Sequence, residues 1–211
     1  MKSSKLYQVQ KEDLPRVEIL LNQCFAADPL YTTLIPDESI RKALMPELFH
    51  CDMNEFYETC EIFADSSELN GILVVSDEAE PYNFLHYYLA EAKAALQTDT
   101  YLIKEDPSLK TLQNFLLGGE YLNSGWTAQL HQCSRLHIIY LAVNPQFQHH
   151  GIADMLMKET IAYAQEHKMM ISLETHNGKN VPFYQHYGFK IYGVLEKHFP
   201  LKQYCLVREI Q

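Results

Sequence analysis

The sequence has few basic residues, and this shortage excludes one large class of partner. Its 211 residues include 17 Lys and Arg against 27 Asp and Glu, which gives a formal net charge of −10 at pH 7. Nucleic-acid binding depends on Lys and Arg that neutralise phosphates, so we expect no nucleic-acid partner. The 8 glycines and 9 prolines are also too few for a fibrous or low-complexity chain. A folded globular protein is therefore expected.

Paired cysteines and long apolar runs are absent as well. The five cysteines are widely spaced and include no C-x-x-C pair, so neither a disulfide framework nor a structural zinc site is predicted, and we expect no metal. The longest strongly apolar stretch, residues 136–143, is far shorter than the roughly 20 residues that span a bilayer. The N-terminus has no apolar signal core. We therefore expect a cytoplasmic protein with no membrane partner.

The acidic residues are concentrated in one window. Residues 51–100 contain eleven acids and the single base Lys93, and the rest of the chain has equal numbers of acids and bases. Two interpretations remain open. The window either forms a solvated acidic face that keeps the protein soluble, or it creates a negative field that attracts a cationic substrate.

Hydrophobic patterning predicts one domain, residues 1–211, in which strands and helices alternate. No repeat and no long linker divides the chain. The elements expected before the last third are a strand at 6–9, a helix at 12–24, a helix from 37 or 38 to about 57, a hairpin of 62–64 and 71–75, and a helical insert at 83–132.

The last third of the chain carries the strongest pattern. Residues 136–143 form a β-rich run that is typical of a central strand buried on both faces. A short loop, an amphipathic helix and a second strand at 169–175 follow. The helix N-terminus presents free backbone N–H groups and a partial positive charge, which suit a phosphate group. Gly151, at the start of this helix, lets the backbone approach such a ligand closely.

Two motifs in this region carry a resemblance to a known family. The segment Gln148–Ala153, Q-H-H-G-I-A, resembles the Q/R-x-x-G-x-G/A acetyl-CoA loop of the GNAT superfamily of N-acetyltransferases. The segment Asn177–Phe189 is similar to the family's N-x-x-[AN]-x-x-[LF]-Y-x-x-x-G-F pattern, and V-P-F-Y-Q within it resembles arylalkylamine N-acetyltransferases. Residues 25–36 are faintly similar to relatives of puromycin N-acetyltransferase. The close resemblance covers about residues 134–196.

The resemblance implies an α/β (α+β) fold of the GNAT type, with a mixed, splayed central β-sheet flanked by helices and a helical insert before the central strand. Acetyl-CoA is then the cosubstrate, with its pantetheine arm in the splay and its pyrophosphate on the loop. The residues implied in its binding are Leu141, Ala142, Val143, Gln148, His149, His150, Gly151, Ile152, Ala153, Asn177, Asn180 and Tyr184.

Some of these residues differ from the commonest residue of the motif, and others have a second interpretation. Gln148 stands where the family often has Arg, and Ala153 stands where it often has Gly; both variants are permitted. His149 and His150 either add charge beside the phosphates when protonated or are simply exposed beside the loop. Asn177 and Asn180 either face the ligand or cap the short helix that follows.

The resemblance also implies catalytic roles. The backbone N–H of Val143 is expected to stabilise the oxyanion, and Tyr184 is expected to give its phenolic proton to the CoA sulfur. The alternative for Tyr184 is a packed core tyrosine. A general base is also needed, because an alkylammonium must lose a proton before it attacks. His137, two alternations before Leu141, and Glu174 on the neighbouring strand are candidates; a core histidine, a surface carboxylate and a water chain are the alternatives.

We therefore expect an acetyl-CoA-dependent N-acetyltransferase that acts on the primary amine of a small cationic acceptor by direct attack in a ternary complex, as a monomer or homodimer. One alternative is a non-catalytic module that senses CoA or acyl-CoA; Tyr184 favours the enzyme. Another is acetylation of a protein or peptide amine. The insert at 83–132 either narrows the acceptor cleft or docks a protein, and the sequence leaves both open.

Overall fold

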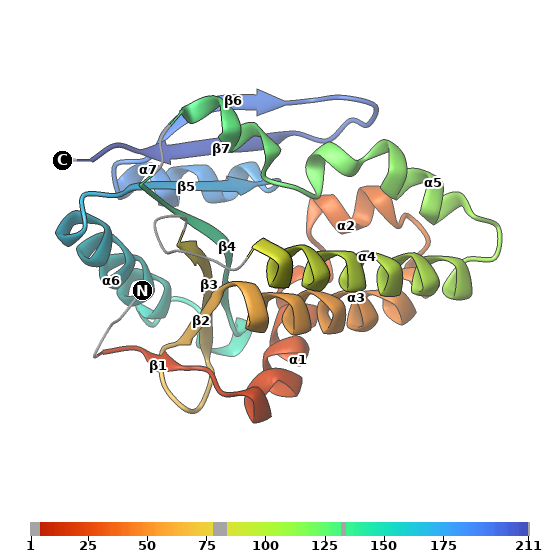
Figure 1. The fold of residues 1–211 in the computed structure, drawn as a ribbon, viewed down its shortest axis with the longest axis horizontal. Helices are drawn as coiled ribbons and strands as arrows, with labels where there is room; N and C mark the ends of the chain where they lie inside the picture. The colour runs from red at the N-terminus through yellow and green to blue at the C-terminus, as the bar shows by residue number, and fades with distance from the viewer. Residues whose placement is uncertain (1–4, 78–83, 132–133, 211) are drawn as a thin grey trace.

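The computed structural model describes residues 5–77, 84–131 and 134–210, so residues 83 and 132 of the expected insert, and Cys133, lie outside it. Its strands form one open sheet in the order β1-β2-β3-β4-β5-β7-β6, flanked by helices (Figure 1). Of the neighbouring strands, β4 and β5 are parallel and the other pairs are antiparallel. This mixed, mostly antiparallel α/β sheet confirms the expected fold class.

The elements follow the expected order, with additions at places where the sequence pattern was weak. The insert consists of α4, α5 and two 3-10 turns, while α2, β6 and β7 were not anticipated. The bounds are β1 Tyr7–Gln8, α1 Leu14–Phe25, α2 Pro29–Leu34, α3 Glu38–Thr59, β2 Glu61–Ala64, β3 Gly71–Asp77, α4 Phe84–Glu105, α5 Lys110–Leu117, β4 Arg135–Val143, α6 Ile152–Glu166, β5 Met170–Thr175, α7 Val181–His186, β6 Lys190–Leu195 and β7 Gln203–Arg208.

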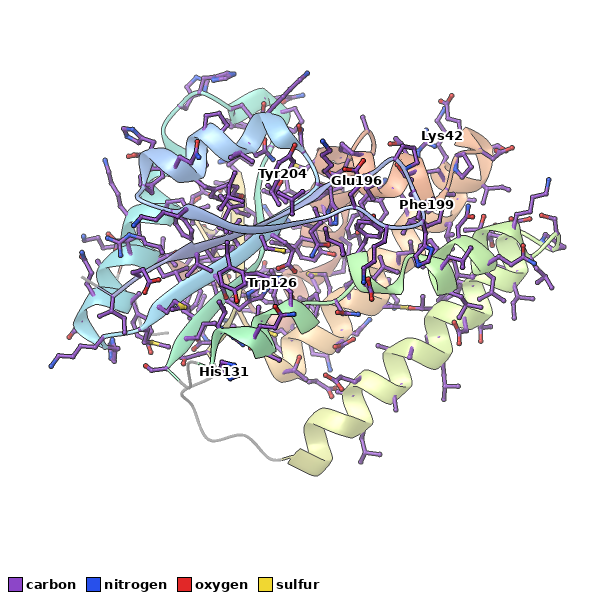
Figure 2. The ribbon with its side chains drawn as sticks, turned by 90° about the horizontal axis from the view of Figure 1, so that it is seen from above. Lys42, Trp126, His131, Glu196, Phe199 and Tyr204 are labelled. Atoms are coloured by element: carbon purple, nitrogen blue, oxygen red, sulfur yellow. The ribbon has the colours of Figure 1, made fainter. Side chains whose placement is uncertain are left out.

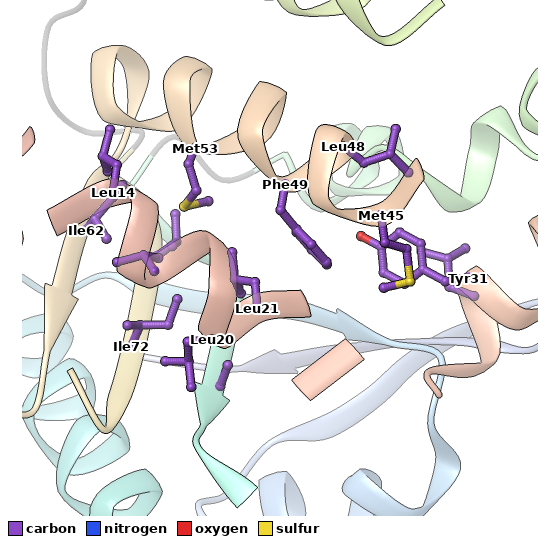
Figure 3. Packing of buried hydrophobic residues seen from close by; sticks show 14 of the residues in the cluster. Leu14, Leu20, Leu21, Tyr31, Met45, Leu48, Phe49, Met53, Ile62 and Ile72 are labelled. Atoms are coloured by element: carbon purple, nitrogen blue, oxygen red, sulfur yellow. The ribbon is translucent and has the colours of Figure 1, made fainter. Parts of the chain in front are cut away.

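Two hydrophobic clusters hold the helices on the sheet. One joins α1, α2 and α3 to β2, β3 and β4, and the other joins α6 and α7 to the middle of the sheet. Figure 3 shows the first cluster, with Phe49 pointing from α3 toward the sheet. The Phe49 ring is 0% exposed, and its centroid lies 5.5 Å from that of Tyr31 and 6.1 Å from that of Tyr140. An aromatic packing centre thus joins α3 to α2 and to the central strand.

Phe49→Ala is expected to lower the free energy of unfolding by about 3–5 kcal/mol, because it removes a fully buried ring and leaves a cavity. Urea unfolding followed by circular dichroism measures this change. The matched control is Phe147→Ala, because Phe147 is 40% exposed outside both clusters and its loss should change the stability little. Equal stability of the two variants would contradict the packing role of Phe49.

The central strand differs from its expected burial along its second half. Arg135–Ile138 is buried, but Ile139, Tyr140, Leu141 and Val143 are only half-buried. The reason is that β4 pairs with β5 over four positions, ending at the pair Ile138–Leu173, and beyond them the strands diverge. The expectation of a strand buried on both faces is therefore wrong for the segment that opens into the splay.

A β-bulge also changes which side chains share a face of β4. Val75 pairs with Ile138 and Val74 with Tyr140, so Ile139 is an extra residue in the strand. As a result Leu136 and Ile138 pack in the same cluster as Leu141, on the side of α6. His137 does not share the face of Leu141, because simple alternation fails at the bulge.

Candidate active site

A cavity of about 660 Å³ opens where β4 and β5 diverge. Its walls are the second half of β4, the loop and the first turn of α6, α7, and the segment that joins α1 to α2. The structure brings together here all but one of the residues that the sequence implied in cofactor binding, namely Leu141, Ala142, Val143, Gln148, His149, Gly151, Ile152, Ala153, Asn177, Asn180 and Tyr184.

His150 is the residue that stays outside. It is exposed, does not line the cavity, and its Nδ1 lies 2.8 Å from the backbone oxygen of Gln148. Its neighbour His149 has a φ of 65° and lines the cavity. The turn thus directs one imidazole toward the cavity and the other toward solvent, so the expected contact of His150 with the cofactor finds no support in this geometry.

The loop after β4 is shaped to present backbone N–H groups. The Asn144 side chain accepts a hydrogen bond from the Gln146 N–H and caps a short 3-10 turn. Gly151 then has a φ of 82°, a conformation that favours glycine, and it stands immediately before α6. A Cβ at Gly151 meets nothing within 4 Å. The free N–H groups of the first turn of α6 therefore adjoin an open space that suits an anion.

The backbone of β4 has free donors along the same cavity. The Asn144 N–H bonds to the Asn70 carbonyl at 2.8 Å, which places that N–H on the β3 side. Successive N–H groups of a strand point to opposite edges, so those of Val143 and Leu141 point toward β5. Since β5 has diverged here, these two groups face the splay. Two donors in a fixed direction suit a carbonyl oxygen or the amide of an extended ligand.

Tyr184 stands on α7 at the inner wall of this cavity. It is 8% exposed, and its ring packs against Phe183 and Phe189 with centroids 5.2 and 5.9 Å away. Burial raises the pKa of Tyr184 to about 12, so the phenol stays protonated at neutral pH. In the part of the chain that the structure describes, no group hydrogen-bonds its hydroxyl. The ring is packed as in the core interpretation, but its hydroxyl is available to a ligand.

The sequence left a ligand-facing and a capping interpretation open for Asn177 and Asn180, and only Asn177 combines the two. Both line the cavity. The Asn177 side chain also accepts from the Lys179 N–H and caps the 3-10 turn Gly178–Asn180, whereas the Asn180 side chain lies 3.5 Å from the Thr175 hydroxyl and caps no helix. Lys179 adds a positive charge to the same wall.

His137 and Glu174 do not line the cavity, although the sequence made them candidate bases. His137 is buried, with its ring nitrogens 2.8 Å from the hydroxyls of Ser124 and Ser172. Glu174 accepts from Ser124 at 2.7 Å and from the Trp126 indole at 2.9 Å. Burial raises the pKa of Glu174, but His137 and the hydrogen bonds together lower it by more, so the pKa lies below its usual value.

This network has a structural role. It attaches the 3-10 turn Gly125–Leu130 of the insert to β4 and β5, and Figure 2 labels Trp126 in that turn. His137 therefore fits the interpretation of a hydrogen-bonded core histidine. Glu174 does not fit the interpretation of a surface carboxylate, because its side chain is only 18% exposed.

Asp28 is a residue of the candidate site that no sequence pattern indicated. Asp28 lines the cavity, at the segment between α1 and α2, and its Oδ1 accepts from the Leu30 N–H at 2.9 Å. Burial raises the pKa of Asp28, while this hydrogen bond and nearby His176 oppose the rise. An Asp before Pro is an ordinary helix-cap pattern, and Asp37 caps α3 in the same way at the surface. No local pattern separates the two.

Cys24 and Phe25 were missed for the same reason. They stand at the end of α1 and line the cavity, and the Cys24 thiol donates to the Val143 carbonyl at 3.3 Å. Burial raises the pKa of Cys24 to about 11, which keeps it a neutral thiol. Phe25 contributes an aromatic wall, whose ring centroid lies 5.4 Å from that of Tyr140.

The insert is fixed to two other parts of the fold, the helix α2 and the loop between β6 and β7. Tyr121 donates to the carbonyls of Lys197 and Leu201, at 2.7 and 3.1 Å, and so holds the loop between β6 and β7. Asn114 donates to the Leu34 carbonyl of α2 at 2.9 Å. Figure 2 shows Phe199 of the β6–β7 loop beside the insert. The insert thus links α2 to the β6–β7 loop.

Residues 116–191, from the end of α5 into β6, match the family model of the acetyltransferase (GNAT) domain. This part of the chain is therefore similar to a GNAT acetyltransferase domain. Enzymes with this domain transfer an acetyl group from acetyl-CoA, and the matched segment contains both motifs and all of β4, α6 and α7. No curated protein sequence matches the chain.

Solved structures are similar to this chain in fold over nearly its whole length. An acetyltransferase from Corynebacterium glutamicum, described as histone acetyltransferase HPA2 and related acetyltransferase, is 16% identical, with a TM-score of 0.63 over 100% of this chain and 98% of the other. Arylalkylamine N-acetyltransferase 2 from Aedes aegypti is 12% identical, with a TM-score of 0.58 over 98% of both chains. Polyamine N-acetyltransferase from Drosophila melanogaster is 13% identical, with a TM-score of 0.54 over 97% and 99%.

Two further findings bear on ligands and environment. Within residues 5–77, 84–131 and 134–210, no group of three or more His, Cys, Asp or Glu side chains is placed to hold a metal ion. The helices in those ranges include none that is long and apolar enough to cross a bilayer.

Proposed function

We propose that the chain is an acetyl-CoA-dependent N-acetyltransferase that acetylates the primary amine of a small, cationic acceptor by direct attack in a ternary complex. One observation carries the proposal: a single cavity holds an anion-binding loop, two free β4 donors and a buried phenol whose hydroxyl is available. The similar structures include enzymes named for polyamine and arylalkylamine acceptors, which supports an amine substrate.

The loop and the splay bind the donor. The N–H groups at the start of α6 hold the pyrophosphate, with His149 and Lys179 beside it, and the pantetheine arm lies along β4 in place of the missing strand pairing. This position brings the thioester next to Val143 and Tyr184. The Val143 N–H then stabilises the negative charge that develops on the carbonyl oxygen during attack.

The reaction at the thioester forms one bond, breaks another and transfers two protons. The amine lone pair forms a C–N bond with the carbonyl carbon, and the C–S bond breaks. The departing sulfur takes the phenolic proton of Tyr184. The new nitrogen–carbon bond makes the remaining N–H acidic, and that proton restores the phenol. One proton of the original ammonium is left over, and it must leave before the attack.

Asp28 is positioned to take this proton. It lines the cavity from the segment between α1 and α2, whereas the other carboxylate of the lining, Asp154, pairs with Lys158, so Asp28 also attracts an ammonium group. The raised pKa of Asp28 brings it closer to that of a useful base. Phe25, which lines the same cavity, supports a compact acceptor with an apolar part.

Asp28→Asn keeps the helix cap but removes the charge. We expect kcat/KM for an alkylamine to fall about 100-fold near neutral pH, while affinity for acetyl-CoA is retained. Because activity requires ionised Asp28, the wild-type rate rises as the pH passes upward through its pKa, and the variant should lose this acidic limb. Thiol release measured across the pH range tests both effects. The matched control is Asp37→Asn, at the exposed cap of α3; equal losses in the two variants would reject the role of Asp28.

The competing function is a module that binds CoA without turnover, and Tyr184 in the cavity argues against it. Calorimetric titration with acetyl-CoA, followed by thiol-release assays with arylalkylamines, polyamines and short peptides, separates the possibilities. Binding with release from one class of small amine supports the proposed function. Binding with release from peptides alone favours a protein acceptor, binding without release favours the sensor, and no binding rejects the donor site.

A further inference from the structure

A polar cluster lies at the point where β4 and β5 separate, on the side of the sheet that contacts the insert. The last paired position joins Ile138 to Leu173, and Glu174 is the first residue of β5 beyond it. The Glu174 carboxylate reaches back across the strands to His137, with Oε2 3.4 Å from Nε2 of the imidazole. A carboxylate with so little exposure is costly compared with an apolar side chain of similar size, so its presence needs an explanation.

Five side chains form this cluster, which we call the clamp: Ser124, Trp126, His137, Ser172 and Glu174. The ring nitrogens of His137 lie 2.8 Å from the Ser124 and Ser172 hydroxyls. Glu174 accepts from the Ser124 hydroxyl at 2.7 Å and from the Trp126 indole at 2.9 Å. Each polar side-chain atom of the clamp therefore has a partner. A buried polar network that is fully satisfied is rigid and specifies one arrangement of the elements that carry it.

The other face of the same two strands is apolar. Its side chains pack with α6 in the second hydrophobic cluster, namely Leu136 and Ile138 of β4 and Ile171 and Leu173 of β5. Apolar contact is non-directional, so this face holds the strands together without fixing the position at which they part. The hydrogen bonds of the clamp supply that direction on the opposite face.

The residue of β5 that follows the clamp is in contact with the donor cavity. The Thr175 hydroxyl accepts from the Asn177 N–H at 3.3 Å and lies 3.5 Å from the side-chain nitrogen of Asn180. Both asparagines line the cavity. A displacement of β5 at Glu174 would therefore move this wall of the cavity relative to the free N–H groups of β4.

We propose that His137 and Glu174 are positioning residues of the donor site, which fix the point where β4 and β5 separate and so the width of the splay that receives acetyl-CoA. This inference rests on the proposed function, because that function assigns the donor to the splay. Neither residue lines the cavity, so each acts through the strand that carries it. The direct contact between them joins β4 and β5 at the first position beyond their last backbone pair.

A purely stabilising role for the clamp makes a different prediction. Loss of the clamp would then lower the stability of the fold but leave the affinity of the folded protein for acetyl-CoA unchanged. Asp106 of the insert offers a matched comparison. Its buried carboxylate accepts from the N–H and hydroxyl groups of both Ser108 and Thr111, and it does not line the cavity. Asp106→Ala thus removes a buried hydrogen-bonded carboxylate without touching the junction of β4 and β5.

The test is the affinity of Glu174→Ala for acetyl-CoA, measured by calorimetry at a temperature where the variants are folded. We expect binding to weaken about 10-fold, because the splay is no longer preorganised for the donor. KM for acetyl-CoA should rise by a similar factor, while kcat at saturating donor changes little, since Tyr184 and Asp28 are retained. Glu174→Gln keeps an oxygen that accepts a hydrogen bond and should recover part of the affinity. Asp106→Ala should bind acetyl-CoA as tightly as the wild type.

Trp126 is the single tryptophan of the chain, so its fluorescence reports the state of the clamp. Its indole donates to Glu174, and its ring centroid lies 5.8 Å from that of Tyr192. In Glu174→Ala the emission should move to longer wavelength, because the indole N–H turns to water. In Asp106→Ala the emission should stay as in the wild type.

The outcomes separate the clamp from the proposed function. Wild-type affinity in folded Glu174→Ala, whatever its emission, would overturn the positioning role, and so would an equal loss of affinity in Asp106→Ala. If Glu174→Ala fails to fold, the same comparison in His137→Gln decides, because this change also removes the contact between the strands. A wild-type protein that binds no acetyl-CoA would overturn the proposed function, and this inference with it.

Discussion

Gly151→Trp is expected to abolish acetyl-CoA binding. The Cβ of this residue points into open space at the loop, so an indole would occupy the volume that the phosphates need. The φ of 82° adds strain of about 1–2 kcal/mol for any side chain there. Calorimetry should show no binding heat at concentrations that saturate the wild-type protein. Gly151→Ala, which introduces the strain without the bulk, should weaken binding much less.

The matched control places the same bulk elsewhere. Gly193 lies on the edge strand β6, its Cβ also meets nothing within 4 Å, and it is outside the cavity. Gly193→Trp should therefore bind acetyl-CoA normally. Retained binding in a folded Gly151→Trp variant would show that the loop between β4 and α6 is not the phosphate site.

Tyr184→Phe is expected to lower kcat by about 100-fold or more while the affinity for acetyl-CoA stays nearly constant, because general-acid catalysis typically contributes this much. The ring keeps its packing against Phe183 and Phe189, and only the hydroxyl is lost. Steady-state thiol release and calorimetry separate the two quantities.

Tyr163→Phe is the matched control for this prediction. Its hydroxyl donates to Asp77 at 2.9 Å, away from the cavity. The rate of this variant should equal that of the wild type. An unchanged kcat in Tyr184→Phe would return Tyr184 to the status of a core tyrosine and leave protonation of sulfur to water.

The sequence predicted the part of the site in which chemistry depends on neighbours along the chain. A strand, a glycine turn and a helix N-terminus are adjacent in sequence, so the pattern from Val143 to Ala153 is visible without a structure. The segment around Tyr184 was recognisable for the same reason. Periodicity likewise indicated the α/β alternation, the hairpin and the insert.

The rest depended on pairings between distant residues. The bulge at Ile139 comes from the register of β3 on β4, and no pattern within β4 reveals it, so counting alternate residues placed His137 on the wrong face. Asp28 looks like any helix cap until α1 and α2 are seen beside the splay. Asp52 lies 88 residues from Tyr140, so only the folded chain shows that they are bonded.

The divergence of β4 and β5 has a consequence for the rigidity of the molecule. The sheet has two halves, one formed by β1–β4 and the other by β5, β7 and β6, and the four paired positions of β4 and β5 are the strand pairing that joins them. In the proposed binding mode, a donor in the splay completes the hydrogen bonding of the interrupted sheet and so links the two halves. At a hundred times its dissociation constant it adds about 2.7 kcal/mol to the stability of the fold. Hydrogen exchange of the Leu141 and Val143 amides should then slow on binding, because the ligand, rather than another strand, accepts their hydrogen bonds.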